Sequence, residues 1–562
     1  MTHLQRALLL APLFLAAAAC SAEAQRSRLP RNNSGGELLP EEACYDVQHY
    51  TLHLEVDPEE RTISGRLRLD ALLVSASERL IMDLDTALEC HSVQWVGAEG
   101  EAAALDVQRT GDRLSVVLPE LEVGAAIALE VTYSGKPRVA PNPPWRGGFT
   151  WTETKDGSPW IATSCQGEGA DLWWPCKDHP SDEAEGMDLF ISVPNPLVVA
   201  ANGRLEGVMP AERTDWSTHH WRITTPINNY GVALNIAPYV TVTDEFESTA
   251  GDTFPFTYWV LPENLEKGRE IFEEFQEHMR FFEEFCGPYP FRGDKYGVVE
   301  TPHLGMEHQS IIAYGNRYRG DANFDYDWLH HHELAHEWWA NLVTARDWKD
   351  FWIHEGIGTY MQPLYLEWKF GRDAYFRKMR LDRRKIANRG AVAPRGNKPT
   401  DWMYFASTST QSPGNDIYFK GSWVCHALRW LLEDESFFEV LRRWAYPTPE
   451  AEQSTDGSAC RLTDTQELVE IAEGIAEQEL DWFFDAYLRQ PALPVLTVDE
   501  RDGVLELSWE SPIPGGFPMP VPVQVGEDLI RVPCPEGKGR VQVGDVDFEI
   551  DPDGWLFADV RS

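Results

Sequence analysis

The chain has 562 residues, 43% of them hydrophobic, and is long enough to form the cores of three or four domains of ordinary size. Its 90 acidic residues against 49 Lys and Arg give a formal net charge of −41. Binding a nucleic-acid backbone requires clustered Lys and Arg, so this charge argues against such a partner. The one basic run, residues 377–389, is typical of the solvated face of a helix and indicates no function by itself.

The first residues have the three-part pattern of an export signal, which we expect to span residues 1–24. The apolar stretch within it, residues 7–19, is too short to cross a bilayer. Residues 17–20 resemble a bacterial lipoprotein cleavage box that would leave Cys20 lipidated, and cleavage after Ala24 is the alternative. We therefore expect a protein of the bacterial periplasm, either free or anchored to the membrane through Cys20, with secretion as the alternative.

Hydrophobic periodicity divides the rest of the chain into four parts. Residues 25–40 are polar and contain Gly and Pro, which indicates a flexible tether. Residues 41–248 carry short alternating runs separated by turn residues, the pattern of an antiparallel β domain. Helical patterns dominate residues 249–490, and alternation returns in residues 491–562, which suggests a small β-sandwich. The expected fold class is therefore multidomain α+β.

A metal-binding pattern lies in the helical part. Of the three consecutive histidines at 330–332, only His332 has another histidine four residues later, His336. Positions i and i+4 lie on one face of a helix, about 5–6 Å apart between Cβ atoms, so two neutral imidazoles can converge on one metal ion. Glu333 points beside that pair and is free to act as general base on the attacking water. None of the eight cysteines after Cys20 falls in a C-x-x-C pair, so no sulfur-ligated metal is indicated.

A two-histidine site needs a third protein ligand. Glu355 lies nineteen positions after His336, within a second helical segment at residues 352–368. A chance H-E-x-x-H would arise in roughly one such chain in twenty, and a glutamate at one set distance makes the match about tenfold rarer. The sequence therefore predicts one zinc ion per chain, bound by His332, His336 and Glu355.

The metal pattern lies inside the run HHELAHEWWANLVTARDWKDFWIHEGIGTY, residues 331–360. This run resembles the zinc aminopeptidases of the gluzincin clan, typified by aminopeptidase N and the leukotriene epoxide hydrolase. The resemblance extends over most of residues 45–500 and implies a thermolysin-like catalytic domain at residues 249–490. Thermolysin-like endopeptidases place their glutamate one residue further away, which disfavours them here. The resemblance also implies a short form that lacks the helical carboxy-terminal domain of many relatives, with a more open cleft.

Residues 304–308, LGMEH, are similar to the G-x-M-E-N exopeptidase motif of that family. The resemblance implies that Glu307 binds the free α-amino group of the substrate. It also implies that Gly305 and Met306 line the same cleft. Two positions depart from the motif: Leu304 and His308. These departures put the close approach of the strand to the substrate in question, whereas the carboxylate is kept.

Two further segments match the family. Tyr418 begins a Y-x-K-G motif, which implies that its hydroxyl stabilises the oxyanion of the tetrahedral intermediate. Gln166 stands where the family has a substrate-contacting glutamine. His354 occupies a position that is usually Asn in the family, next to the third ligand, and is either a group that supports that ligand or a polar substitute.

Taken together, the motifs predict a zinc-dependent aminopeptidase that hydrolyses amino-terminal residues from peptides. In this interpretation Glu333 is the general base, Tyr418 stabilises the oxyanion and Glu307 anchors the α-amine. One alternative is an epoxide hydrolase with peptidase activity, of the leukotriene type, which requires an apolar tunnel. The other is a tethered binding lipoprotein with a structural zinc. The preference for particular amino-terminal residues and the oligomeric state are not indicated by the sequence.

Overall fold

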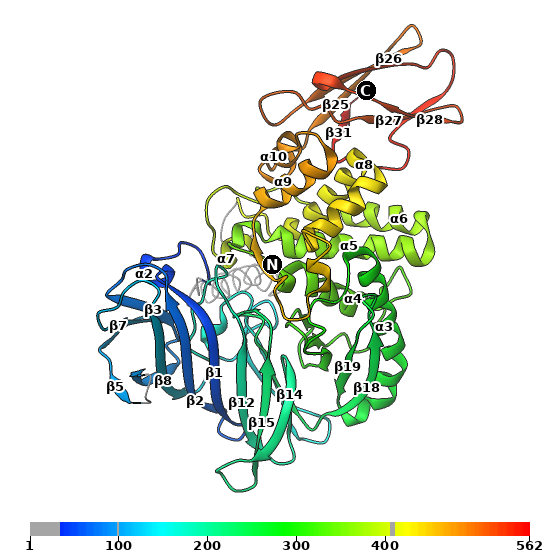
Figure 1. The fold of residues 1–562 in the computed structure, drawn as a ribbon. Helices are drawn as coiled ribbons and strands as arrows, with labels where there is room; N and C mark the ends of the chain where they lie inside the picture. The colour runs from blue at the N-terminus through cyan, green and yellow to red at the C-terminus, as the bar shows by residue number, and fades with distance from the viewer. Residues whose placement is uncertain (1–33, 98–100, 405–410, 562) are drawn as a thin grey trace, which may run out of the picture.

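The computed structural model describes residues 34–97, 101–404 and 411–561. The export signal, Cys20 and the first part of the expected tether lie outside the described residues, so their assignments stay predictions. Eight cysteines lie within the described residues, and all of them are free thiols. No described helix is both long enough and apolar enough to cross a membrane. Figure 1 shows three regions in chain order: a β region, a helical region and a small β region at the carboxy-terminal end.

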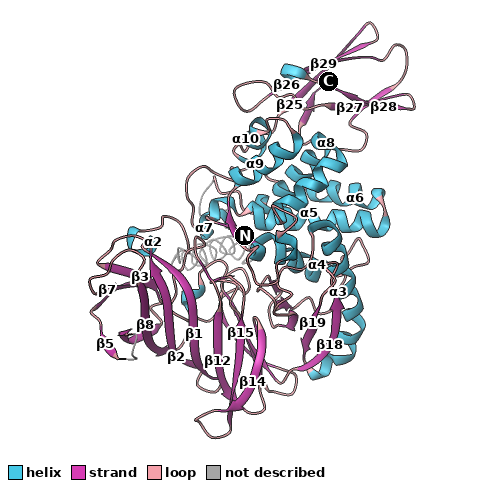
Figure 2. Ribbon diagram, viewed as in Figure 1, coloured by secondary structure: helices cyan, strands magenta, loops and turns pink. Residues whose placement is uncertain are grey.

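The amino-terminal region is built on one sheet of eight strands (Figure 2). Across the sheet the strands are β14 (Arg204–Pro210), β15 (Trp216–Ile223), β12 (Met187–Pro194), β1 (Tyr45–Asp57), β2 (Thr62–Leu73), β8 (Ala126–Gly135), β4 (Leu88–Val96) and β5 (Ala102–Ala104). Alternation in β1 buries Leu52, Leu54 and Val56 and leaves the side chains between them partly or fully exposed. All neighbouring strands are antiparallel except β1 and β12, which run parallel. The predicted β-rich domain is confirmed, with that one parallel pair.

A second, smaller sheet connects this region to the helical one. Its strands are β13 (Val198–Ala201), β17 (Leu234–Ala237), β10 (Pro159–Ser164) and β9 (Gly148–Glu153), in that order. Directly after β10 the chain enters a buried loop that carries Gln166. The end of β10 therefore places Gln166 toward the helical region.

The helical region also contains a sheet of its own. It consists of β18 (Val240–Glu247), β19 (Thr253–Val260), β20 (Tyr296–Glu300), β22 (Ile312–Tyr314) and β21 (Gly305–Met306). Because β18 begins at Val240, the sheet starts before residue 249, where the helical pattern begins in the sequence. Helix α3 (Leu265–Cys286) packs beside this sheet, and Phe275, Met279 and Phe282 on one of its faces are fully buried.

The remaining helices form the body of this region (Figure 1). They are α4 (Trp328–Ala335), α5 (Trp352–Phe370), α6 (Arg372–Arg383), α7 (Thr400–Tyr404), α8 (Asp416–Ala445), α9 (Thr465–Ala476) and α10 (Asp481–Leu488). Helix α5 packs against α4, α6 and α8, so it is the central helix of the group. It is buried from Trp352 to Leu366, and the polar residues Glu355, Thr359 and Gln362 line the cavity described below. The predicted mostly helical catalytic domain is confirmed.

The carboxy-terminal region contains two small sheets. One consists of β29 (Lys538–Gln542), β26 (Val504–Glu510), β25 (Val495–Arg501) and β31 (Asp559–Arg561), and the other of β28 (Asp528–Val532), β27 (Val521–Val525) and β30 (Phe548–Ile550). Trp509 and Phe517 are buried in its core with ring centroids 5.2 Å apart. The predicted terminal β domain is thus confirmed.

Residues 34–39, the described part of the expected tether, are packed rather than free. The Ser34 hydroxyl donates to Oδ1 of Asp178 at 3.2 Å, and the Ser34 carbonyl accepts from the Thr400 N–H at 3.2 Å. Gly35 forms a β-bridge with Pro399. These contacts fasten the start of the β region to the segment before α7. The composition of the segment indicates a loop but not its tertiary partners, which explains the difference.

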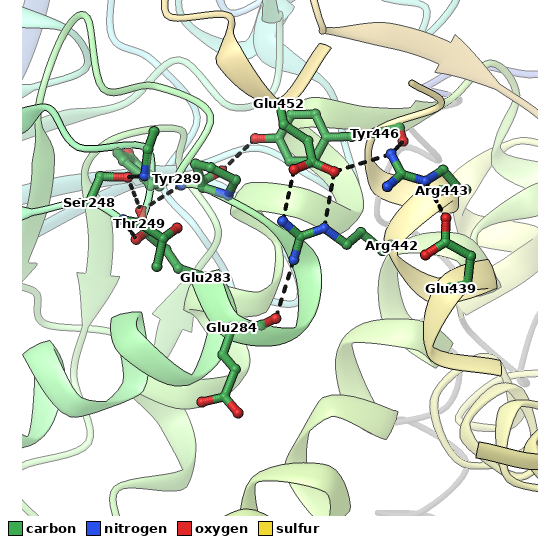
Figure 3. A network of polar contacts seen from close by, with 12 residues as sticks. Ser248, Thr249, Glu283, Glu284, Tyr289, Glu439, Arg442, Arg443, Tyr446 and Glu452 are labelled. Atoms are coloured by element: carbon green, nitrogen blue, oxygen red, sulfur yellow. Dashed lines mark hydrogen bonds and ion pairs between the residues drawn. The ribbon is translucent and has the colours of Figure 1, made fainter. Parts of the chain in front are cut away.

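A polar network fixes the end of α3 (Figure 3). Glu283 is 2% exposed, and its carboxylate accepts from the Ser248 hydroxyl at 2.7 Å and from the N–H groups of Thr249 and Tyr289 at 2.7 and 2.8 Å. Nearby, Arg442 on α8 binds Glu452 through two hydrogen bonds of 3.0 and 2.8 Å. The network therefore joins the β18–β19 turn, α3 and α8.

We expect Glu283→Ala to lower the free energy of unfolding by about 2–3 kcal/mol, because three donors, two of them buried, would lose their acceptor. Glu284→Ala is the matched control, since Glu284 is the next residue but exposed, and we expect a change within about 0.5 kcal/mol. The first cooperative transition in a urea titration measures both. Equal effects of the two substitutions would show that the buried network contributes nothing.

Candidate active site

Three side chains from two helices meet at the centre of the helical region. His332 on α4, His336 just after it and Glu355 on α5 bring one ligand atom each within 4.8 Å of one another. The two Nε2 atoms lie 3.4 Å apart, and Oε2 of Glu355 lies 3.5 Å from each of them. A tetrahedral zinc ion with bonds of about 2.0–2.1 Å holds its ligands roughly 3.3 Å apart. The three atoms therefore have the spacing of one face of a zinc tetrahedron.

The electrostatics of the site also fit a cation. Oε2 of Glu355 is buried without a hydrogen-bond partner. Burial, followed by the charge of Glu307, raises the pKa of Glu333 well above its usual range. Burial lowers the pKa of His336, but the close contact with Glu355 and its charge outweigh burial and raise the pKa to about 10. A divalent cation supplies the positive charge that these buried carboxylates otherwise take from protons, so the donor set fits zinc.

The chain just after α4 orients the second histidine. Nδ1 of His336 donates to the carbonyl of Trp339 at 3.0 Å, which leaves Nε2 with a lone pair toward the metal position. The helix is interrupted here, because the Asn341 N–H bonds to the His336 carbonyl at 3.0 Å in a turn wider than an α-helical one. This wide turn brings the Trp339 carbonyl back to the imidazole.

Glu333 lies beside the three ligands, against strand β21. A Cβ added at Gly305 would lie 2.3 Å from Oε1 of Glu333 and 2.6 Å from Cδ1 of Leu329. A larger residue at this position would force the Glu333 and Leu329 side chains to move. The close approach of this strand to the substrate stays a prediction.

Glu307 directly follows β21 and is 3% exposed. The Gln166 amide donates to its Oε1, and Nδ2 of Asn341 donates to its backbone carbonyl at 3.0 Å. Burial raises the pKa of Glu307, and the charge of His336 and a contact with Tyr230 oppose that rise. Glu307 is thus a buried carboxylate held next to the metal position by residues of both the β region and the helical region.

Tyr418 approaches the site from the first turn of α8. Its hydroxyl donates to Oε1 of Glu355 at 2.9 Å and lies 2.9 Å from the hydroxyl of Tyr404. The two helices come this close because glycines face each other at their crossing: a Cβ on Gly356 would lie 2.8 Å from Cα of Gly421. These glycines follow Glu355 and Tyr418 by one and three residues, so their contact sets the distance between the two functional side chains.

All nine site residues predicted from the sequence line one cavity of about 410 Å³. A cavity of this size encloses a small ligand, for which roughly 300–1,000 Å³ is usual.

A larger hollow of about 730 Å³ lies over α3, and its lining is mainly acidic. Within the described residues, the one group that brings three metal-ligand atoms together is His332, His336 and Glu355. The chemistry therefore points to the smaller cavity, and the roles of its residues stay predictions.

The neighbouring histidines are core or supporting groups. Nδ1 of His330 lies 2.9 Å from Nδ1 of His278, and its Nε2 lies 2.7 Å from the Tyr296 hydroxyl. Burial lowers the pKa of His330 well below its usual range. Nε2 of His354 accepts from the Ala345 N–H at 2.8 Å, so it holds the start of α5 in place next to Glu355.

The sequence did not reveal four residues that the structure places at this site. Tyr230 lies beside Glu307, Tyr404 lies beside Tyr418, and two lysines, Lys378 and Lys385, line the cavity. The tyrosines carry no local motif, so only long-range packing reveals them. The lysines lie in the basic run at residues 377–389, which was the one feature of the sequence that could have pointed to them.

Two sequence models of one protein family match the chain, and together they cover more than half of its length. The peptidase M1 N-terminal domain matches residues 46–230, and the peptidase family M1 domain matches residues 272–487. The chain belongs to peptidase family M1. The predicted resemblance to the aminopeptidase N-like gluzincins is thereby confirmed.

Individual relatives are distant. Leukotriene A-4 hydrolase of Xenopus laevis is 24% identical over 339 residues, which are 57% of this chain and 51% of that protein. Leucine aminopeptidase 2 of Lodderomyces elongisporus is 25% identical over 340 residues, 58% of this chain and 48% of that protein. Aminopeptidase N of Haemonchus contortus is 23% identical over 438 residues, which are 71% of this chain and 42% of that protein. The chain thus spans about half the length of the curated relatives it matches.

Solved structures of the family share the fold. A mutant M1 zinc metallopeptidase from Deinococcus radiodurans, bound to a Tyr-Ser-Ala substrate, has a TM-score of 0.64 at 22% identity. The match covers 83% of this chain and 98% of that one. The unmutated Deinococcus protein gives a TM-score of 0.62 at 23% identity. The arrangement of β region and helical region is therefore that of M1 peptidases.

Two substitutions separate metal binding from catalysis. We expect Glu333→Gln to lower turnover of peptides by about 10²–10⁴-fold with its zinc retained, because Glu333 is not one of the three converging ligands. His336→Ala should lose the metal itself. Zinc analysis of both purified proteins, together with turnover, makes the comparison. Loss of zinc from Glu333→Gln would assign Glu333 to the metal instead.

Proposed function

We propose that this M1 peptidase is a zinc-dependent aminopeptidase, which removes amino-terminal residues from peptides with a free α-amine. The observation that carries the proposal is the position of Glu307. Its buried carboxylate lies in the same cavity as His332, Glu333 and His336, and its charge acts on both Glu333 and His336. A carboxylate at this place pairs with a protonated amine, and in a cavity shielded from water such a charge-assisted contact is strong.

The anchored amine determines which bond is cut. With the α-amine at Glu307, the first peptide bond of the substrate lies at the metal position. Gln166 holds Glu307 in its orientation, and the strand of Gly305 and Met306 supplies one wall of the cavity. A chain extending further on the amino-terminal side would have to displace these buried groups, so an endopeptidase is disfavoured.

The catalytic roles follow from position and charge. Zinc, when bound, polarises the scissile carbonyl and makes water more acidic. Glu333 takes a proton from the attacking water and passes it to the leaving amine, because it lies beside the three metal ligands without being one of them. The Tyr418 hydroxyl turns from Oε1 of Glu355 toward the oxyanion as negative charge develops there.

The lining of the cavity favours a peptide over a lipid substrate. An epoxide hydrolase of the leukotriene type requires an apolar tunnel, whereas this cavity is lined by Asp321, Lys378 and Lys385 in addition to the catalytic groups. The presence of Glu333 and Tyr418 at the metal position favours an enzyme over a binding lipoprotein. Two of the similar proteins are named as aminopeptidases, which agrees with the proposal.

We expect the protein to cut free peptides one residue at a time from the amino terminus, and acetylation of the α-amine to abolish cleavage because it removes the cation. Glu307→Gln should lower kcat/KM on free peptides by about 100-fold, the usual effect of losing one partner of a shielded charge pair. Its zinc content should stay unchanged. Mass spectrometry of timed digests gives both the site and the rate of cleavage.

Efficient cleavage of acetylated peptides at internal bonds by the unmutated protein would contradict the aminopeptidase assignment. Such a result would classify the protein as an endopeptidase, and Glu307→Gln would then have little effect on the rate.

A further inference from the structure

A second charged group lines the catalytic cavity, away from Glu307. Lys378 on α6 and Lys385 just after α6 both contribute to the lining. They are seven residues apart, which is two helical turns, so they lie on the same side of this segment. Among the lining residues they are the only Lys or Arg. The lining also holds four carboxylates, so the two lysines are a local positive group within an acidic cavity of an acidic chain.

The two lysines share one carboxylate. Asp382 is fully buried, and its two oxygens accept from Nζ of Lys378 at 2.5 Å and from Nζ of Lys385 at 2.9 Å. Two ammonium groups against one carboxylate leave one positive charge in excess. Asp321 also lines the cavity, but the described structure shows no ion pair between it and either lysine. Its Oδ1 accepts from backbone N–H groups of the next turn instead.

The excess charge is available at Lys385. The Lys378 side chain is 7% exposed and is held against Asp382, whereas the Lys385 side chain is 50% exposed. Nζ of Lys385 lies 4.4 Å from the ring centroid of Phe419, which is the residue after Tyr418. The ammonium group of Lys385 therefore lies at the first turn of α8, against the residue that follows Tyr418, with room for an anionic partner.

The lysines and Glu307 enter the cavity from different elements. Glu307 follows strand β21 and is held by Gln166, whereas Lys385 follows α6 and lies against Phe419 on α8. The cavity is thus lined by a carboxylate from one element and by an ammonium group from another, with the metal position in the same cavity. A short peptide has the complementary charges, an amine at one end and a carboxylate at the other.

We propose that Lys385, supported by Lys378 and Asp382, binds a carboxylate of the substrate on the carboxy-terminal side of the scissile bond. This inference rests on the proposed aminopeptidase function and adds a substrate class, namely short peptides that carry a carboxylate one or two residues after the cut bond. The carboxylate has two chemical sources: the free carboxy terminus of a di- or tripeptide, or an acidic side chain in a longer one. Lys385 is a specificity residue in this account.

The experiment compares substrates that differ only in this charge. The first arm uses X-Gly and X-Gly-Gly, each as the free acid and as the carboxy-terminal amide, where X is the amino-terminal residue that the enzyme cleaves best. The second arm uses X-Glu-amide and X-Gln-amide. We expect the unmutated protein to favour the charged member by about tenfold in kcat/KM, mainly through KM. The arm with the larger preference identifies the source of the carboxylate.

Variants assign the preference to Lys385. Lys385→Met should reduce the ratio between charged and neutral substrates to about one, and Lys385→Arg should restore part of it, because the positive charge returns. Arg384→Met is the matched control: Arg384 is exposed, adjacent and equally charged, but it is not part of the lining, so the ratio should stay that of the unmutated protein.

The outcomes separate this inference from the function on which it rests. If the unmutated protein cleaves neutral amides but shows no preference for the charged substrates, the carboxylate site is wrong and the aminopeptidase assignment stands. A preference that survives in Lys385→Met would overturn the role of Lys385. If no peptide with a free α-amine is cleaved at all, the aminopeptidase assignment itself fails.

Discussion

The crossing of α5 and α8 is the contact on which the geometry of the site depends. Gly356 and Gly421 meet there with backbone against backbone, and a Cβ at either position would come within 2.8 Å of the other glycine's Cα. Glu355 precedes one of these glycines, and Tyr418 lies one helical turn before the other. The crossing therefore determines both where the third metal ligand stands and how the tyrosine hydroxyl reaches it. Larger side chains at the crossing would separate the metal from its oxyanion donor.

Charge is the second constraint. Glu307, Glu333 and Glu355 are all buried in one cavity, and buried carboxylates are costly unless a cation or a proton compensates them. In the proposed function, a bound metal ion would compensate the central group and the amine of the substrate would compensate Glu307. Substrate binding would then complete the charge balance of the cavity. The proposed lysine site extends the same balance to the carboxylate of the substrate.

The sequence predicted the parts of the site that depend on local spacing. Helical geometry paired the i, i+4 histidines, and the need for a third ligand pointed to the glutamate nineteen residues later, whereas Glu307 and Gly305 were identified through the resemblance to the family motif. Tyr230 and Tyr404 could not be predicted in this way, because each joins the site through packing between segments distant in the chain. Alternation predicted the strands of the amino-terminal region, but the parallel pairing of β1 with β12 depends on a long crossover that no local pattern records. The packing of Ser34 and Gly35 was missed for the same reason.

The central claim is that one zinc ion, held by His332, His336 and Glu355, is required for peptide hydrolysis. Titration of zinc into chelator-treated protein tests it most directly, with bound metal and aminopeptidase rate followed in the same samples. The account predicts that the metal-free protein is inactive and that binding and activity rise together to a plateau at about one equivalent. Full activity before zinc is added, or a rate that rises only after a second equivalent has bound, would contradict it.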